Sequence, residues 1–228
     1  MKAYIQTNKN GDYYNVNAFI AAEGFETLGF EVIKYHEVEE VKHKDKEAIF
    51  VGGISNIKKR LKYLGIDKQN QEDYPKELQA FFNRKIWKST LKTIIKNEAY
   101  GIFIKPTETK FFQGKVIREF RDFIGLNYDE EVEIWCSEVV EILTEWRCFI
   151  RYGKLLDVRY YKGYWNNKLD INLVNTAIEQ YTNQPAAYSL DFGIGKDGKY
   201  YLIEVNDGYS MGSYGMLPVP YAKFLSAR

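Results

Sequence analysis

The chain has 228 residues, of which 45% are apolar and 28% charged, enough to build one large domain or two to three small lobes. A formal net charge of +1 gives no case for nucleic acid or an anionic membrane as the main partner. The first residues lack the apolar core of a signal peptide, and no stretch approaches the roughly 20 apolar residues of a membrane span. We therefore expect a cytoplasmic protein that binds neither nucleic acid nor membrane.

The cysteine and histidine residues predict no disulfide and no catalytic pair. Cys136 and Cys148 lie in apolar runs typical of strands, where buried reduced thiols are expected. His36 and His43 lie in a polar stretch rich in Glu and Lys, so both are expected on the solvated surface. The high content of Tyr and Phe favours a sheet-rich α/β protein.

The first part of the chain alternates short strands and helices in an order that implies a small, mostly parallel sheet. Strands are predicted at 3–7, 30–35 and 48–51, and helices at 16–28 and from a cap at Ser55 to residue 64. Residues 67–80 are polar, contain Pro75 and are interpreted as a connection.

The rest of the chain is predicted to form two further units. From residue 81, the pattern predicts an amphipathic helix at 85–96, strands at 101–105, 111–117 and 133–140, and a short helix that ends at 123. There follow a hairpin of 143–151 and 155–161 across Tyr152-Gly153, a helix at 173–181, and a hairpin of 187–194 and 199–205 across Asp197-Gly198.

The last hairpin predicts that two carboxylates face each other. Asp-Gly between alternating strands is a strong signal for a two-residue type I′ turn, in which Lys196 faces Lys199. Counting outward from this pair, Asp191 falls opposite Glu204, with Cβ atoms about 4.5–5.5 Å apart. Like charges at that distance are destabilising, so a compensating cation is expected.

Asn206 lies two residues beyond Glu204 on the same face and would complete an all-oxygen cluster. A few protein oxygens combined with nucleotide phosphates are the ligands that Mg²⁺ prefers. A solvated strand face neutralised by nearby lysines explains the pattern equally well, and a register slip of one residue would separate the carboxylates. The glycines at 193, 195 and 198 match GxGxxG, but a strand follows them where that motif needs a helix.

A hairpin that ends in Glu-x-Asn, with an Asp on the preceding strand, resembles the magnesium site of the ATP-grasp fold. Four other segments resemble that family in order. These are Ile102–Pro106 for the strand with a phosphate-binding lysine, Phe111–Lys115 for the loop over the phosphates, Ser137–Glu141 for the hinge between the ATP-holding lobes, and Glu145–Arg147 with Arg159 for the arginine-bearing hairpin. The set is most similar to the compact R2K clade, named for two arginines and a lysine.

The resemblance covers nearly the whole chain and implies an ATP-grasp fold of α/β class, with α+β lobes and a small preceding α/β domain. The implied domains are the preceding domain at 1–80, the N-lobe at 81–140 and the C-lobe with the metal site at 141–228.

The chain departs from the family pattern at two places. Its phosphate loop has bulky Phe111 and Phe112 and only Gly114, so it is not a glycine-rich cradle. The first phosphate lysine of the family usually lies at the start of a helix. Here the candidates for it are Lys85, Lys88 and Lys92, and Lys88 is favoured.

By resemblance, Lys105 contacts the α- and β-phosphates, although a lysine at a strand end before proline can also be simply solvated. Arg147 and Arg159 depend on the register of their hairpin. A three-residue loop matches the apolar faces and places both arginines on one face with Glu145 and Asp157, so we expect that loop. The resemblance implies that the two forks hold the γ-phosphate and the substrate carboxylate, and a structural ion-pair network is the alternative.

The resemblance also implies contacts to the nucleoside. The backbone of Glu138 and Val140 would bind the adenine edge, and Glu141 the ribose hydroxyls. Leu202 either packs under the adenine or belongs to the core. Ser213 and Tyr214, in the glycine-rich loop after the metal residues, either help to bind substrate or lie in a plain surface loop.

Together these expectations describe a carboxylate–amine ligase that depends on ATP and on Mg²⁺ or Mn²⁺. It would form an amide or peptide bond through an acyl phosphate and release ADP and phosphate. Its partners would be ATP, a small carboxylate or peptide substrate, and an amine. Two alternatives stay open, a non-catalytic ATP-binding module and a small-molecule kinase on the same scaffold.

Overall fold

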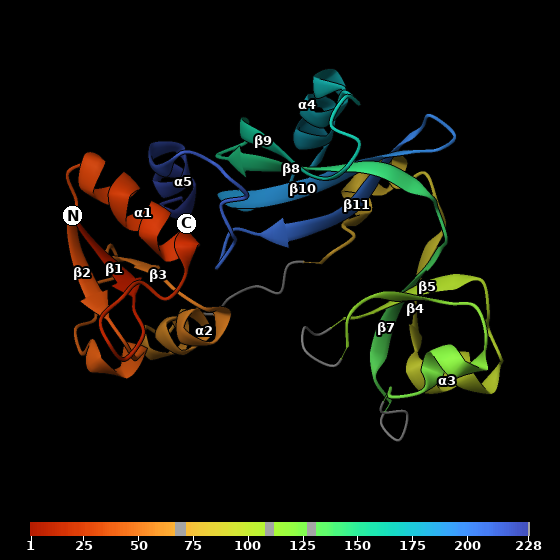
Figure 1. The fold of residues 1–228 in the computed structure, drawn as a ribbon, viewed down its shortest axis with the longest axis horizontal. Coiled ribbons are helices and arrows are strands. Elements are labelled where there is room, and N and C mark those ends of the chain that lie inside the picture. Colours follow the sequence, from red (N-terminus) through yellow and green to blue (C-terminus); the bar gives the residue numbers. More distant parts are fainter. Residues whose placement is uncertain (67–71, 108–111, 127–130, 228) are drawn as a thin grey trace. The chain divides into compact units, whose positions relative to one another are not determined.

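A computed structural model describes residues 1–66, 72–107, 112–126 and 131–227 (Figure 1). The chain divides into two compact units. Unit 1 comprises Met1–Gln79, Thr144–Gly193 and Leu202–Arg228, and unit 2 comprises Ala80–Leu143 and Ile194–Tyr201. Unit 1 is therefore built from segments far apart in the sequence, and it contains every residue of the predicted metal site.

The N-terminal part of unit 1 is a parallel sheet in the order β2-β1-β3, with β1 at Lys2–Gln6, β2 at Glu31–Tyr35 and β3 at Ile49–Val51. Helix α1 (Val16–Thr27) joins β1 to β2, and helix α2 (Ile54–Tyr63) follows β3. Ala3 and Ile5 of β1 pack toward α1, whereas Tyr4 packs toward α2. Both faces are covered, as a parallel sheet requires. Gly53 rather than the predicted Ser55 is the N-cap of α2.

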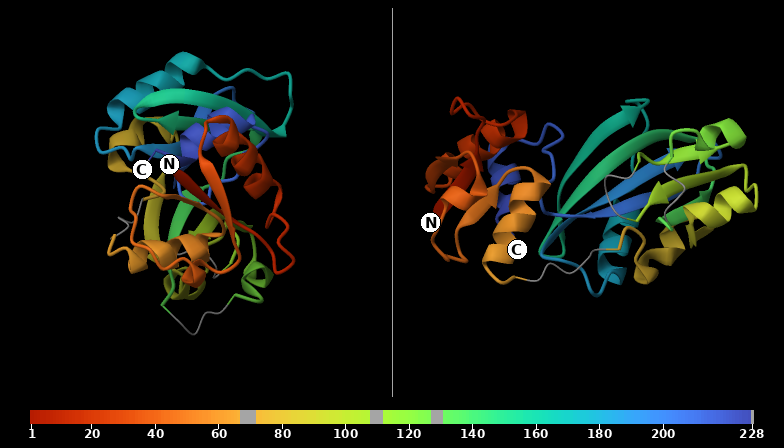
Figure 2. Two further views of the ribbon diagram at one scale, coloured as in Figure 1. Left: turned by 90° about the vertical axis from the view of Figure 1, so that its left-hand side faces the viewer. Right: turned by 90° about the horizontal axis from the view of Figure 1, so that it is seen from below.

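The last helix of the chain, α5 (Pro218–Leu225), returns to the N-terminal sheet and packs against α1 (Figures 1 and 2). The close approach depends on Gly24, because a Cβ atom at this position would lie 2.0 Å from the carbonyl oxygen of Pro218. Phe149 and Ala187, from the second half of unit 1, join the same buried cluster. One core therefore connects the N-terminal sheet to the strands that carry the predicted metal site.

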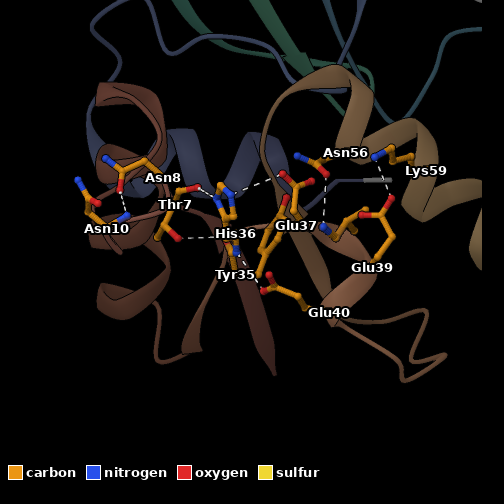
Figure 3. A network of polar contacts seen from close by, with 11 residues as sticks. Thr7, Asn8, Asn10, Tyr35, His36, Glu37, Glu39, Glu40, Asn56 and Lys59 are labelled. Carbon is orange, nitrogen blue, oxygen red and sulfur yellow. Dashed lines mark hydrogen bonds and ion pairs between the residues drawn. The ribbon is translucent and has the colours of Figure 1, made fainter.

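The two histidines lie at the rim of the N-terminal sheet and are half-buried, so the prediction of solvated surface holds only in part. His36 is half-buried, and its Nδ1 lies 3.1 Å from the carbonyl oxygen of Thr7 (Figure 3). His43 Nε2 lies 2.7 Å from the hydroxyl of Tyr4, and Arg60 donates to the His43 carbonyl. Burial and the charge of Arg60 lower the pKa of His43. Both histidines thus have structural roles in the N-terminal sheet.

The second sheet of unit 1 has the order β11-β10-β8-β9. Its strands are β8 (Ile142–Arg151), β9 (Lys154–Gly163), β10 (Ala187–Gly195) and β11 (Tyr200–Asp207). Helix α4 (Ile171–Gln180) joins β9 to β10 and packs on β9. Tyr181, directly after α4, contacts Tyr188 of β10 edge to face. Because strand side chains alternate, the residues of β10 that neighbour Tyr188 in the sequence point to the opposite face.

The β8–β9 hairpin confirms the predicted pairing of the arginines but not the predicted loop. Tyr152 and Gly153, with φ of +49° and +67°, form a two-residue turn instead of a three-residue one. A bulge between Phe149 and Ile150 then shifts the register by one residue, so that Arg147 lies directly opposite Arg159. The bulge does what the longer loop was expected to do, because it restores the match between the apolar faces.

The turn of the β10–β11 hairpin also differs from the prediction. Gly195 N–H donates to the Lys199 carbonyl, and Gly198 N–H donates to the Gly195 carbonyl, so three residues lie between the paired positions. Gly198 has a φ of +79° while Asp197 does not have a positive φ, which excludes the type I′ turn. At the other end of the hairpin, Gly208 N–H donates to the Ala187 carbonyl.

Unit 2 contains an antiparallel sheet in the order β4-β7-β5-β6. Its strands are β4 (Ile86–Thr90), β5 (Ile102–Pro106), β6 (Lys115–Ile117) and β7 (Glu133–Glu138). Helix α3 (Leu91–Lys96) packs on one face through Leu91 and Ile94, and a 3₁₀ helix spans Phe120–Phe123. The strand predicted at 111–117 begins only at Lys115, and Phe111 lies outside the described residues.

The helix predicted at 85–96 is wrong in its first half, which forms β4. Ile86, Trp87 and Thr90 are β-branched or aromatic residues that favour a strand, and β4 pairs with β7. Thr90 then caps α3, because its hydroxyl accepts the Thr93 N–H. This correction places Lys88 on a strand rather than on a helix.

Both cysteines are buried free thiols, as predicted, and burial raises the pKa of Cys136 to about 11. Among the described residues, no helix is long and apolar enough to cross a membrane.

The close contact of α1 with α5 predicts a specific cost for Gly24→Ala. The added methyl group would overlap the backbone of Pro218, and overpacking of this kind destabilises a core by about 1–3 kcal/mol. The melting temperature should fall by several degrees. The control is Glu23→Ala at the neighbouring exposed position of the same helix, which should leave the melting temperature nearly unchanged. Equal melting temperatures for the two variants would contradict the tight packing.

Candidate active site

An ion pair between Arg147 of β8 and Asp191 of β10 lies at the centre of the candidate site. Arg147 Nε donates to Asp191 Oδ1 at 2.8 Å, and Arg147 Nη2 donates to Asp191 Oδ2 at 2.5 Å. The same Nη2 lies 3.8 Å from Oε1 of Glu204 on β11. The Asp191 side chain is only 2% exposed. One guanidinium therefore lies between the two carboxylates for which the sequence predicts a compensating cation.

The third predicted ligand lies next to this pair. Asn206 donates its side-chain amide N–H to Glu204 Oε1 at 3.0 Å, which leaves its carbonyl oxygen as an acceptor. Among the described parts of the chain, no three or more His, Cys, Asp and Glu side chains gather to hold a metal ion. Two carboxylates and one amide oxygen nevertheless fit Mg²⁺, which binds through one or two carboxylates together with substrate phosphates.

Tyr161 of β9 adds a hydroxyl group that the sequence analysis missed. Its oxygen lies 2.8 Å from Glu145 Oε2 and 3.4 Å from Asp191 Oδ2. A bulge explains this orientation, because Trp146 pairs with Tyr160 while Glu145 pairs with Lys162, and Tyr161 is the extra residue between them. The signal for it in the sequence is weak, since a bulge changes the face on which a side chain lies without changing the residue pattern.

The glycine-rich loop after β11 covers the ion pair. The ring of Tyr214 lies 4.4 Å from the centre of the Arg147 guanidinium, and Tyr161 contacts Tyr214 edge to face. Tyr214 has a φ of +50°, which is uncommon for a residue with a side chain and typical of functional loops. Ser213 instead points inward, where its N–H and hydroxyl both donate to Asn17 Oδ1. Ser213 therefore anchors the loop to α1.

Burial and charge act against each other at the ion pair. Burial raises the pKa of Asp191 to about 6, although Arg147 acts to lower it, and Glu204 and Glu145 add to the rise. Burial disfavours the charged guanidinium, but the hydrogen bonds and charge of Asp191 outweigh it and raise the pKa of Arg147. At neutral pH both groups are charged, so each depends on the other for neutralisation.

Arg159 shares a face with Arg147 but has its own carboxylate. Its Nε and Nη2 lie 3.0 Å and 2.6 Å from Asp157 Oδ2 on the same strand. Like charges directly opposite each other on a sheet repel, so the two arginines need separate counterions. The face predicted to hold both arginines is thus present, with each guanidinium bound to an aspartate in this structure.

Unit 2 carries two of the predicted phosphate-binding residues on one sheet face. Lys88 of β4 and Lys105 of β5 both lie directly opposite Trp135 of the intervening strand β7. Directly opposite side chains point to the same face, and Lys88 Nζ lies 4.6 Å from the Trp135 ring. The core of the unit lies on the other face, with Ile104 and Cys136. Trp135 is not among the predicted site residues, although its alternation with Ile134 and Cys136 indicates an outward position.

Comparison with known families decides the assignment. The family described as ATP-grasp domain, R2K clade family 2, matches residues 81–224. The chain belongs to this ATP-grasp family. ATP-grasp proteins of this kind are ATP-dependent carbon–nitrogen ligases that use ATP and Mg²⁺. No curated protein matches the chain.

Solved structures show the same fold at low identity. The RimK domain protein ATP-grasp from Sphaerobacter thermophilus is 12% identical over 99% of this chain and 98% of its own, with a TM-score of 0.65. D-cycloserine synthetase DcsG is 10% identical over 99% of both chains, with a TM-score of 0.63. The D-alanine–D-alanine ligase of Bacillus anthracis complexed with ATP is 15% identical over 98% of this chain and 94% of its own, with a TM-score of 0.61. These likenesses confirm the ATP-grasp fold.

The remaining ATP-grasp candidates lie at the ends of strands in unit 2. Gly114 directly precedes β6, and a Cβ there would lie 2.6 Å from the Phe103 ring. Glu138 ends β7, and its Oε2 accepts the backbone N–H of Lys85. Val140 is half-buried between β7 and β8. Glu141 forms an exposed ion pair of 3.3 Å with Lys196, whose backbone N–H also donates to the Glu141 carbonyl.

Leu202, on β11 in unit 1, is fully buried. Of the candidates for the first phosphate lysine, Lys92 forms an exposed ion pair with Glu131, and Lys85 lies over the ring of Trp87.

Removal of Arg147 should destabilise the protein strongly, since Asp191 would keep a buried and unpaired charge. We expect Arg147→Met to lower the free energy of unfolding by about 3–5 kcal/mol, and Arg147→Met/Asp191→Asn to recover part of that loss. Arg159→Met is the matched control, since its pair with Asp157 is more exposed and should contribute about 0–1 kcal/mol. Chemical denaturation measures all three. An equal loss for the two arginines would contradict the central position of Arg147.

Proposed function

We propose that the protein is an ATP- and Mg²⁺-dependent carboxylate–amine ligase that forms an amide or peptide bond through an acyl phosphate. The observation that carries this proposal is the arrangement around Arg147, where Asp191, Glu204 and Asn206 gather their oxygen atoms on one sheet face. No protein nucleophile is required, because the substrate carboxylate itself accepts the phosphoryl group. The amine then attacks the acyl carbon, and phosphate leaves.

Asp191, Glu204 and Asn206 are the proposed ligands of the metal ion. When bound, Mg²⁺ supplies positive charge that stabilises the phosphates in the transition state. Both carboxylates must be ionised for this role, and with a pKa of about 6 Asp191 is ionised at neutral pH. Asn206 positions Glu204 through its amide N–H, so that the carboxylate is oriented before any ligand binds.

Lys88 and Lys105 are the proposed phosphate contacts. They lie on either side of Trp135, so their backbones are two strand spacings apart, or about 9–10 Å. Long lysine side chains on one face can bring both ammonium groups to adjacent phosphates from that distance. Gly114, at the start of β6, would allow the phosphate loop to approach closely, as the family pattern implies.

The hinge segment is proposed to bind the nucleoside. The backbone of Glu138 and Val140 would contact the adenine edge, and Glu141 would bind the ribose hydroxyls after releasing its exposed partner Lys196. An exposed pair of this kind contributes little to stability, so its exchange for ribose costs little. Leu202 is fully buried on β11, which favours a place in the core over a direct contact with the adenine.

Arg147 and Arg159 are the proposed contacts to the transferred phosphoryl group and to the substrate carboxylate. A planar guanidinium binds either group through two parallel hydrogen bonds. Unit 1 contains a pocket of about 180 Å³ that we propose holds a small substrate. Asn17, Gly52 and Met211 are among the residues that line it, and Met211 belongs to the loop that also carries Tyr214. Apolar and amide groups dominate this lining, which suits a small acid or amine with an apolar part.

The experiment that tests this function is calorimetry of ATP binding with and without Mg²⁺, followed by product analysis. Glu204→Gln removes one metal ligand and should abolish both Mg²⁺-dependent ATP binding and turnover while leaving the melting temperature nearly unchanged. Glu179→Gln, an exposed position on α4, is the control and should behave as the wild type. An active Glu204→Gln variant would contradict the assignment of Glu204 as a metal ligand. ADP formed together with a phosphorylated product, without an amide, would identify a kinase instead.

A second prediction separates the candidate lysines. Lys88→Ala should weaken ATP binding about tenfold or more, because a charge-assisted contact to phosphate is lost. Lys92→Ala should change ATP affinity by less than about twofold, since Lys92 lies on α3 and pairs with Glu131. Titration of both variants with ATP in the same buffer gives the comparison. Equal losses would mean that the face defined by Trp135 does not bind the phosphates.

A further inference from the structure

Arg147 lies against both carboxylates that would hold the metal ion, Asp191 and Glu204. Its fork uses both oxygens of Asp191, and the nitrogen at 2.5 Å from Asp191 Oδ2 also lies 3.8 Å from Glu204 Oε1. A buried carboxylate next to a second one is costly unless a cation compensates for it. Arg147 provides that compensation from within the chain, so one of the two negative charges is already neutralised before a metal ion binds.

Aromatic contacts hold the guanidinium in this position. The guanidinium carbon of Arg147, Cζ, lies 4.4 Å from the centre of the Tyr214 ring and 5.8 Å from the centre of the Tyr161 ring. The Arg147 side chain is only 11% exposed, and Tyr161 also donates a hydrogen bond to Glu145 beside the pair. A cation that is enclosed in this way is displaced only if it gains another partner.

We propose that Arg147 is the resident cation of the metal site and competes with Mg²⁺ for Asp191 and Glu204. With Arg147 in place, the three side chains carry a combined charge of −1, which is too little to hold a free divalent ion firmly. Phosphate groups would give Arg147 a second anion to bind, and one oxygen of Asp191 would then be free to serve as a metal ligand. The metal and the nucleotide therefore bind cooperatively, and by linkage each raises the affinity of the other equally. This inference rests on the proposed assignment of the metal ligands.

A fixed structural ion pair is the alternative role for Arg147. In that case Glu204 and Asn206 alone would contact the metal, and Asp191 would stay bound to Arg147 throughout. The two roles differ in what happens when Arg147 is removed. A competing cation leaves behind a site that binds free metal more tightly, whereas a structural partner leaves behind only a less stable protein.

Binding of free Mn²⁺, measured by electron paramagnetic resonance without nucleotide, distinguishes these roles. We expect Arg147→Met to bind free Mn²⁺ at least about tenfold more tightly than the wild type, and the gain in Mn²⁺ affinity upon adding ATP to shrink by a similar factor. Arg159→Met is the matched control, because it removes a guanidinium from the same face that pairs with Asp157 instead. Its affinity for free Mn²⁺ should equal that of the wild type.

Equal Mn²⁺ affinities of wild type and Arg147→Met would overturn the proposal. If Arg147→Met is unfolded without metal, Mn²⁺ at millimolar concentration or below should restore its melting transition. If Mn²⁺ does not restore it, Arg147→Lys is the variant that tests the proposal. The lysine keeps the charge but loses the bidentate fork, so it should bind free Mn²⁺ more tightly than the wild type, and no gain there also refutes competition.

Glu204→Gln separates this inference from the proposed function. If that substitution abolishes Mg²⁺-dependent ATP binding while Arg147→Met shows no gain for free Mn²⁺, the metal site stands and only the competition is wrong. If Glu204→Gln changes nothing, the metal assignment itself is wrong.

Discussion

The pairing of Arg147 with Asp191 is the interaction on which the rest of the candidate site depends. Both groups are almost fully buried, and neither could keep its charge there alone. The pair brings β8 and β10 together at one point and draws Glu204 of β11 toward the same nitrogen. Tyr161 and Tyr214 contact it from a bulged strand and from a loop. Four segments of unit 1 are therefore ordered around a single guanidinium.

The core of unit 1 adjoins this arrangement on the same sheet face. Phe149, two residues after Arg147 on β8, belongs to the cluster in which α1 and α5 pack together. Ser213 binds Asn17 of α1 and so anchors the loop that places Tyr214 over Arg147. The N-terminal part of unit 1 thus helps to position the site, although the site residues themselves come from later segments of the chain.

Unit 2 positions its two candidate lysines without any buried ion pair among its described residues. It holds two ammonium groups on one face of an antiparallel sheet and keeps its apolar residues on the other. Trp135 lies between the lysines and offers its ring to Lys88, which favours an extended position of that side chain above the sheet. A strand alternates its faces by geometry alone, so this arrangement needs only correct register and no buried charge.

The sequence by itself determined most of the strands and helices, because the alternation of side chains along a segment is a local property. Asp191, Glu204 and Asn206 were identifiable from a hairpin of 20 or so residues. Only the tertiary structure decided what neutralises them. Arg147 is 44 residues away from Asp191, and no local pattern reports a contact between β8 and β10. The bulges that direct Tyr161 and align the two arginines were equally hidden, since an extra residue in a strand leaves its composition unchanged. Lys88 was assigned to a helix because Ile86 to Ile95 also fits helical spacing, and pairing with β7 outweighed that spacing.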